Sequence, residues 1–151
     1  MFPELSSLRM VIHTLNHVKP VLKGASKLHT LSLSGVISNY EEIPELLKNT
    51  PNLQSLTLNL SKFNEALMNF QQLFLYCEKI SKLHLSNISI SEQSLIDISQ
   101  YGKHLVSFTL ENAISNKQNI SVWKNPQCKL KHLNISCDPN MSQKNWKIFY
   151  F

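Results

Sequence analysis

Residues 80–85 read Ile-Ser-Lys-Leu-His-Leu and decide the fold of this chain. Ile80, Leu83 and Leu85 have the spacing of a short strand that packs one edge against a core. Residues 91–98, which follow shortly after, carry the apolar step of a short helix. The predicted structural unit is therefore a strand followed by a helix.

The same apolar triplet recurs along the chain, and its first positions lie 23, 25, 27, 25 and 25 residues apart. With roughly three residues in ten being Leu, Ile, Met or Phe, accident alone would produce about four such triplets. Chance does not explain the near-even spacing of the triplets or the insert of similar length that follows each copy. The other copies are Leu5/Leu8/Met10, Leu28/Leu31/Leu33, Leu53/Leu56/Leu58, Leu105/Phe108/Leu110 and Leu130/Leu133/Ile135.

A period of 20–29 residues with the pattern L-x-x-L-x-L is the signature of a leucine-rich repeat. One such unit cannot bury its apolar edge alone, so each unit must stack on the next. We therefore expect an α/β leucine-rich repeat solenoid of about six repeats, with parallel strands on the concave side and helices on the convex side. Residues 1–151 would form a single domain.

The inserts between the strands predict helices. Residues 41–47 carry acids and Pro44 in their first turn, which suits a helix N-terminus. Ser91 is a predicted N-cap and Gly102 a predicted stop. The buried face of that helix would be Leu95, Ile98 and Tyr101.

Three further inserts are less regular. Leu15, Val18 and Leu22 predict a helix that Pro20 shortens or kinks. A longer helix would start at Asn64 as N-cap and bury Leu67, Phe70, Phe74 and Cys77. Residues 120–126 predict a turn or a single helical turn, because Asn125-Pro126 cuts the segment short.

Composition favours an ordinary folded domain: the 151 residues are 42% hydrophobic and 17% charged. No apolar run approaches the length of a membrane span, and the N-terminus lacks a signal-peptide pattern. We therefore expect a cytoplasmic or nuclear protein. Its three cysteines are an odd number without a C-x-x-C pair, so reduced, mostly buried thiols are expected rather than disulfides or zinc ligands.

Catalytic patterns are missing from the sequence. Its three glycines form no phosphate-binding loop, and its six histidines include no His-Glu-x-x-His. Only His13 and His17 would share a helix face, which is weak support for a metal site. The expectation is a protein that is not an enzyme, with no cofactor and no metal.

The formal net charge of +5 invites a nucleic-acid-binding alternative. The lysines are dispersed, however, and the densest cluster is Lys129 and Lys131 with His132. A solvated basic surface is the simpler interpretation, and nucleic acid binding through a basic solenoid remains the second hypothesis.

Residues 90–98, followed by Gly102 and Leu105, resemble the cysteine-containing leucine-rich repeat found behind the F-box in F-box/LRR proteins. Cys77 occupies the position at which that class has its cysteine. Thr50-Pro51-Asn52-Leu53 resembles the Pro-Asn-Leu that often replaces the cysteine. Gly102 departs from the class, which has cysteine there. The resemblance implies a ribonuclease-inhibitor-like (RNI-like) horseshoe that recognises substrates for an SCF ubiquitin ligase.

An F-box needs some forty residues or more, and there is no room for one before Leu5. The resemblance thus implies the substrate-recognition half only, and an SCF adaptor could bind only through an F-box outside this chain. Neither end of the repeat array looks capped by a polar unit, as the apolar Phe149-Tyr150-Phe151 illustrates. We therefore expect part of a longer solenoid, or self-association through the ends.

The expected function is protein–protein interaction through the concave face. Residues between the leucines of each triplet point away from the core, because strand residues alternate faces. That face would be polar and mildly basic, without the aromatic side chains on which single-stranded nucleic acids stack. The candidate partner-binding residues are Arg9, His29, Ser32, Thr57, Lys82, His84, Thr109, Lys131, His132 and Asn134.

Overall fold

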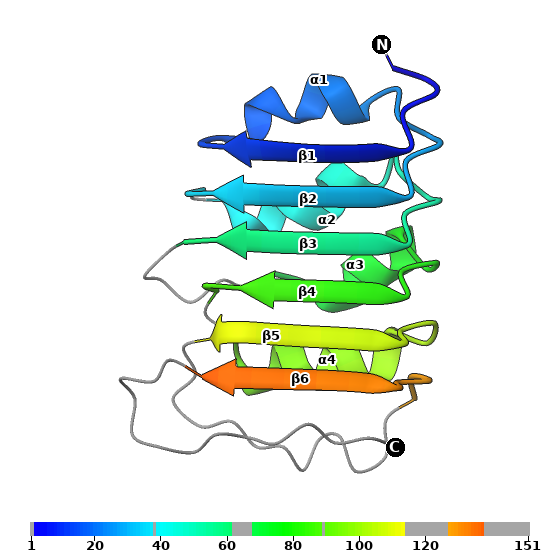
Figure 1. The fold of residues 1–151 in the computed structure, drawn as a ribbon. Coiled ribbons are helices and arrows are strands. Elements are labelled where there is room, and N and C mark those ends of the chain that lie inside the picture. The colour runs from blue at the N-terminus through cyan, green and yellow to red at the C-terminus, as the bar shows by residue number, and fades with distance from the viewer. Residues whose placement is uncertain (1, 38, 62–67, 89, 114–126, 138–151) are drawn as a thin grey trace.

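A computed structural model describes residues 2–37, 39–61, 68–88, 90–113 and 127–137 (Figure 1). The strands are β1 (Ser7–Ile12), β2 (Thr30–Gly35), β3 (Ser55–Leu60), β4 (Lys82–Ser86), β5 (Ser107–Ala113) and β6 (His132–Cys137). The helices are α1 (Lys19–Leu22), α2 (Ile43–Leu47), α3 (Phe70–Tyr76) and α4 (Glu92–Tyr101), and the 3₁₀ turns η1 (Leu15–His17) and η2 (Tyr40–Glu42) precede α1 and α2.

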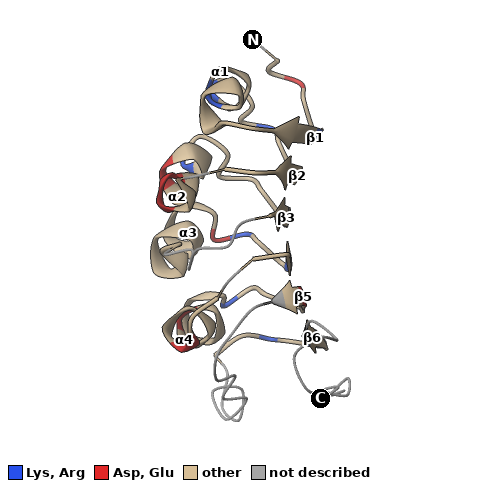
Figure 2. Cartoon of the chain, turned by 90° about the vertical axis from the view of Figure 1, so that its left-hand side faces the viewer, with Lys and Arg blue, Asp and Glu red and all other residues tan. Residues whose placement is uncertain are grey.

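The six strands form one parallel sheet in the order β1-β2-β3-β4-β5-β6, so neighbours in sequence are neighbours in space. Each connection returns to the same end of the sheet, as parallel pairing requires. The sheet is open rather than closed into a barrel. Figure 2 shows α1, α2, α3 and α4 on one face of this sheet. The predicted α/β class with a parallel sheet is confirmed.

The apolar triplets determine how neighbouring strands align. Their second residues lie opposite one another in one row: Leu8, Leu31, Leu56, Leu83, Phe108 and Leu133. Their third residues form the next inward row: Met10, Leu33, Leu58, Leu85, Leu110 and Ile135. Both rows are buried from β2 to β6 and only partly buried in β1. Since a buried Leu contributes about 1.5–3 kcal/mol, these rows are the main source of stability.

A repeated turn leads from the helix layer back to the sheet. In four connections one buried residue accepts a backbone hydrogen bond from the first residue of the next triplet, at 2.8–3.2 Å. The acceptors are Ala25, Thr50, Cys77 and Gly102, and the donors are Leu28, Leu53, Ile80 and Leu105. Only small or compact side chains occupy this position, because the residue lies between two layers.

Two of these turn residues show how tightly the layers pack. Cys77 is fully buried, and its thiol donates to the carbonyl of Leu47 at 3.5 Å. Burial raises the pKa of this thiol to about 11. A Cβ on Gly102 would lie 2.7 Å from the carbonyl oxygen of Ile98 and 3.1 Å from the ring of Phe74. Gly102 therefore leaves no room for a side chain, because the Ile98 carbonyl and the Phe74 ring fill the space.

The helix starts follow their capping signals. Ser91 caps α4 as predicted, and its hydroxyl accepts a hydrogen bond from the Ser94 N–H at 3.1 Å. Pro44 lies in the first turn of α2, as predicted. Pro20 lies in the first turn of α1, so the predicted first helix is divided into η1 and a short α1.

Two helix predictions were wrong in detail. The third helix begins at Phe70, where the Asn69 side chain accepts from the Gln72 N–H at 2.9 Å. Tyr101 is 38% exposed rather than buried, because Gly102 takes the inward position one residue later. Cys77 and Cys128 are free and buried, as expected. The predicted cap Asn64, the buried Leu67, the turn at 120–126 and the apolar tail at 149–151 lie outside the described residues.

Candidate functional site

The face of the sheet opposite the helices, here called the sheet face, carries a continuous row of polar side chains. Strand alternation places this row between the two buried rows of apolar residues. The register aligns it across all six strands as Arg9, Ser32, Thr57, His84, Thr109 and Asn134. All six belong to the predicted partner-binding set, so the fold brings residues 125 positions apart in sequence onto one line.

A second row runs alongside the first, nearer the start of each strand. It consists of Ser7, Thr30, Ser55, Lys82, Ser107 and His132. Lys82 and His132 were predicted as site residues. His29 and Lys131 were also predicted there, but each lies one residue before its strand. Their N–H groups donate to the carbonyls of Ser6 and Val106 at 2.8 Å, which extends the backbone ladder beyond the strands.

Sequence reasoning missed a third row, nearer the end of each strand. It consists of Val11, Ser34, Asn59, Ser86, Glu111 and Ser136. The signal was available, because the alternation simply continues one residue beyond the last apolar position of each triplet. The predicted set contains only residues between the apolar positions of each triplet, so it lacks Glu111.

Asn59 of this third row and two asparagines next to the row form a ladder of side-chain hydrogen bonds. The Asn87 amide donates to the Asn59 side-chain oxygen at 2.8 Å, and the Asn112 amide donates to that of Asn87 at 3.2 Å. Asn87 and Asn112 have φ angles of 55° and 50°, a region that asparagine tolerates better than most residues. The ladder holds the strand ends together and borders the sheet face.

His84 and Glu111 make the closest contact between titratable side chains among the described residues of the sheet face. The His84 Nε2 atom lies 3.3 Å from a Glu111 carboxylate oxygen, without hydrogen-bond geometry. The two side chains are 39% and 43% exposed, so water screens their attraction. They lie diagonally across β4 and β5, since His84 faces Thr109 and Ser86 faces Glu111.

Charge is distributed unequally between the two sides of the sheet. The sheet face and its flanking residues carry Arg9, Lys82 and Lys131 together with His29, His84 and His132. Within the described ranges, Glu111 is the only acid in the three rows. The other described acids lie in the helix layer and the loops: Glu4, Glu41, Glu42, Glu45, Glu78, Glu92 and Asp97. An equal number of described lysines lies there too, so that side is close to neutral: Lys19, Lys23, Lys27, Lys48, Lys79, Lys103 and Lys129. Figure 2 shows the acidic positions on α2 and α4.

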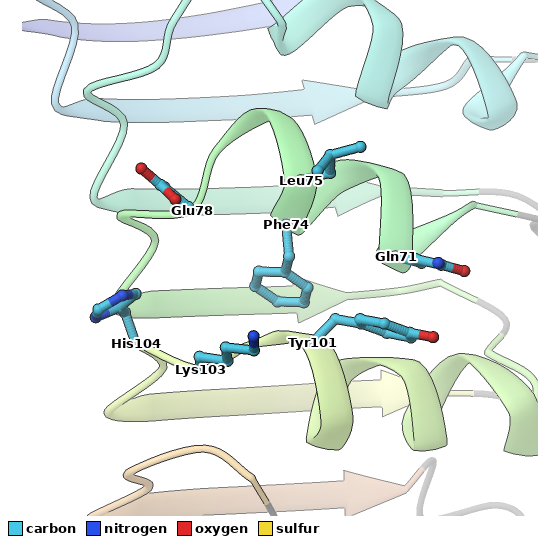
Figure 3. A pocket seen from close by; sticks show the side chains of 7 residues that line it. All are labelled: Gln71, Phe74, Leu75, Glu78, Tyr101, Lys103 and His104. Atoms are coloured by element: carbon cyan, nitrogen blue, oxygen red, sulfur yellow. The ribbon is translucent and has the colours of Figure 1, made fainter.

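Two of the hollows lined by described residues lie away from the sheet face. One, of about 260 Å³, is between α3 and the end of α4, where Phe74 forms the floor and Leu75, Glu78, Tyr101 and Lys103 surround it (Figure 3). Leu75 is 74% exposed there. The residues that line this hollow come from only two of the segments that connect the strands, whereas the sheet face spans all six strands.

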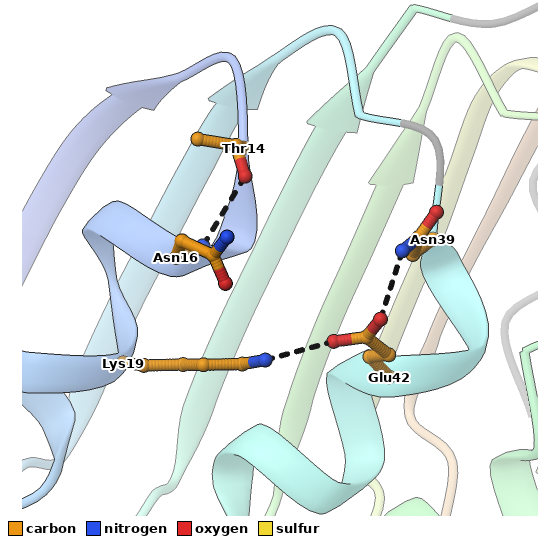
Figure 4. A network of polar contacts seen from close by, with 5 residues as sticks. All are labelled: Thr14, Asn16, Lys19, Asn39 and Glu42. Carbon is orange, nitrogen blue, oxygen red and sulfur yellow. Dashed lines mark hydrogen bonds and ion pairs between the residues drawn. The ribbon is translucent and has the colours of Figure 1, made fainter.

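The other hollow, of about 110 Å³, lies beside a polar network that joins α1 to α2 (Figure 4). The Lys19 ammonium donates to Glu42 at 3.0 Å, and the Asn39 amide donates to the same carboxylate at 2.8 Å. These hydrogen bonds, with that from Asn39 the largest cause, lower the pKa of Glu42. The Lys19–Glu42 contact links the first helix of one connection to the start of the next, so this network joins the two helices.

Nothing in the described part of the chain has the arrangement of a metal site, since no three His, Cys, Asp or Glu side chains gather there. The predicted pairing of His13 and His17 on one helix was wrong, because His13 precedes η1 and is not helical. None of the helices among the described residues is long and apolar enough to cross a membrane. What the sheet face offers chemically is an array of hydroxyl, amide, imidazole and cationic groups that can donate hydrogen bonds.

Comparison with protein-family models, with curated proteins and with solved structures found no match for this chain. The candidate site therefore stands on the geometry of its own residues.

Proposed function

We propose that this chain is a leucine-rich repeat module of about six units, RNI-like in architecture, whose sheet face binds a protein partner without catalysis. The observation that carries the proposal is the row from Arg9 to Asn134. Six polar side chains lie in register on a face that no described helix covers. A parallel sheet normally has both faces covered by other elements. A polar face without such a cover is therefore available to contact solvent or a binding partner.

The repeat interpretation is supported by the way each triplet is used. Residues spaced 23–27 apart in sequence occupy equivalent positions in neighbouring strands. The turn residues Ala25, Thr50, Cys77 and Gly102 also recur with the same backbone hydrogen bond. Such quasi-one-dimensional stacking is the property that defines repeat proteins.

A role similar to the substrate-recognition part of an F-box/LRR ubiquitin-ligase subunit is the specific form of this proposal. It rests on the resemblance of residues 90–105 to the cysteine-containing repeat and on the position of Cys77 at a buried turn. Co-expression of the full-length gene product with an SCF adaptor tests this role. If no F-box is encoded and no adaptor co-purifies, the ligase role is wrong while binding by the sheet face still stands.

Binding by the sheet face is tested with a photo-crosslinking amino acid placed at Thr57 or Thr109. The matched control is the same amino acid at Gln100, an exposed position of α4. We expect one discrete adduct from both sheet positions and none from Gln100. The partner is then identified by mass spectrometry and purified, and its affinity for the chain is measured directly. Equal labelling from Gln100 would contradict the proposal.

Nucleic acid binding is the second candidate, and the cations Arg9, Lys82 and Lys131 on or beside the sheet face favour it. Against it, the three described rows contain no Phe, Tyr or Trp on which bases could stack. Affinity for RNA or DNA that falls steeply with salt would support this candidate, because counterions are released on binding. An absent signal at low salt would dismiss it.

A further inference from the structure

We infer that the segment bound by the sheet face is acidic and extended, and that it crosses the strands from β1 to β6. This inference rests on the proposed function and adds the chemistry of the partner. It starts from the excess of positive charge on the sheet face, because in the helix layer and loops the seven described acids are matched by seven lysines. A partner of complementary charge would be attracted to the sheet face more than to the rest of the described surface.

The cations are placed along the whole width of the sheet. Arg9 belongs to β1, Lys82 to β4 and Lys131 immediately precedes β6. With strands about 4.8 Å apart, Arg9 and Lys82 are separated by three strand spacings, roughly 14 Å, and Lys82 and Lys131 by two, roughly 10 Å. Both gaps exceed the screening length of about 8 Å at physiological salt, so each cation acts as a separate anchor.

An extended chain rises about 3.4 Å per residue. Because successive side chains of an extended chain alternate faces, a segment lying across the strands would meet the three anchors with acidic residues an even number of positions apart, about four for the first gap and about two to four for the second. Between the anchors it would lie over Ser32, Thr57 and Thr109, whose hydroxyls can donate to carboxylates or to backbone carbonyls.

The size of the sheet face also favours a segment over a globular partner. Five strand spacings and strands of six residues span roughly 24 Å by 20 Å, about 500 Å². A standard protein–protein interface buries about 800 Å² on each partner. The sheet face alone is smaller than that, whereas a segment of about eight extended residues covers its width.

Glu111 is the exception that limits which segments fit. Its carboxylate lies 3.3 Å from His84 and offsets the positive charge of the sheet face between β4 and β5. An acidic residue of the partner near Glu111 would be repelled, so the preferred segment has a neutral or basic residue there.

The test is fluorescence anisotropy with a labelled peptide of about ten residues, rich in glutamate, and with the same peptide carrying glutamine in its place. We expect the glutamate peptide to bind at low salt at least about tenfold more tightly than the glutamine peptide. Lys82→Glu is expected to weaken that binding about fivefold or more. Lys23→Glu, which makes the same change in net charge beside α1, is expected to leave it within about twofold.

Other outcomes overturn the inference. Equal weakening by Lys23→Glu would mean that only net charge is sensed, and tighter binding of a single-stranded RNA than of the peptide would point to the other class of partner. Circular dichroism verifies the fold of each variant, and Lys82→Gln supplies a milder change at the same position. If the glutamate peptide does not bind while the Thr57 crosslink persists, the acidic partner is wrong and the binding face stands. Loss of both would contradict the proposed function itself.

Discussion

His84 on β4 and Glu111 on β5 lie with Nε2 and a carboxylate oxygen 3.3 Å apart, on a face whose other charged groups in the described rows are cationic. Both side chains are substantially exposed, so their attraction adds little to stability. Their effect is on the electrostatic potential of the sheet face, where Glu111 offsets the positive charge nearest to it.

Glu111→Gln is therefore expected to change the free energy of unfolding by less than about 1 kcal/mol, measured by urea denaturation. Affinity for the glutamate-rich peptide is expected to rise about two- to fivefold, because an opposing charge is removed from the sheet face. Glu92→Gln in the first turn of α4 is the control, with no change in affinity. Unchanged affinity in Glu111→Gln would show that this carboxylate does not face the bound segment.

Leu56→Ala and Thr57→Ser separate the inward from the outward rows of β3. Leu56 is fully buried in the central part of the core, so its truncation is expected to cost about 2–5 kcal/mol of unfolding free energy. Thr57 lies on the sheet face, and its change to Ser is expected to cost less than about 1 kcal/mol. Chemical denaturation of the two variants measures both values. Similar losses would mean that the two residues do not face opposite sides of the sheet.

Most of the sheet could be predicted from the triplets, because apolar residues at equivalent positions of each unit can be buried only by stacking in register. The start of α4 could be predicted from Ser91, since its cap is made with a residue three positions away. The predicted start of α3 was wrong because several asparagines precede this helix. Only the tertiary fold determines that Asn69 is its N-cap. The prediction that Tyr101 is buried was wrong because the turn at Gly102 ends the helical periodicity.

The candidate site was predictable in outline and not in its electrostatics. Alternation places Thr57, His84 and Thr109 on one face without knowledge of the fold. The contact between His84 and Glu111 depends on the offset between β4 and β5, which is a property of the paired strands. The exclusion of the other described acids from the sheet face also emerges only when helices and strands are assembled.

Cys77 predicts a measurable pH dependence. An unfolded thiol has the ordinary pKa of 9.0, whereas burial raises the folded pKa to about 11. The unfolded state therefore loses its proton first, and stability present below pH 9 is lost as the pH rises to about 11, by roughly 2–3 kcal/mol. The measurement is the free energy of unfolding against pH, compared with Cys77→Ala. Parallel curves for the two proteins would contradict the burial of this thiol.

The β1 edge predicts self-association. Leu8 and Met10 are only partly buried, whereas their neighbours Leu31 and Leu33 are fully buried, and no described strand pairs with the outer edge of β1. The mass from light scattering is expected to rise with concentration. Met10→Lys should suppress the rise, while Val36→Lys, at an exposed apolar residue just after β2, should not. A monodisperse monomer at tens of micromolar, stable for hours, would show that this edge is covered.

The most direct test of the sheet face as the binding surface is an NMR titration of the ¹⁵N-labelled chain with the glutamate-rich peptide. Amide shifts are expected to move along all six strands, β1 to β6, including Arg9, Thr57, His84 and Thr109, while α1 to α4 stay unchanged. Shifts confined to Gln71, Leu75 and Tyr101 would instead place the binding site in the hollow between α3 and α4, and would contradict the account.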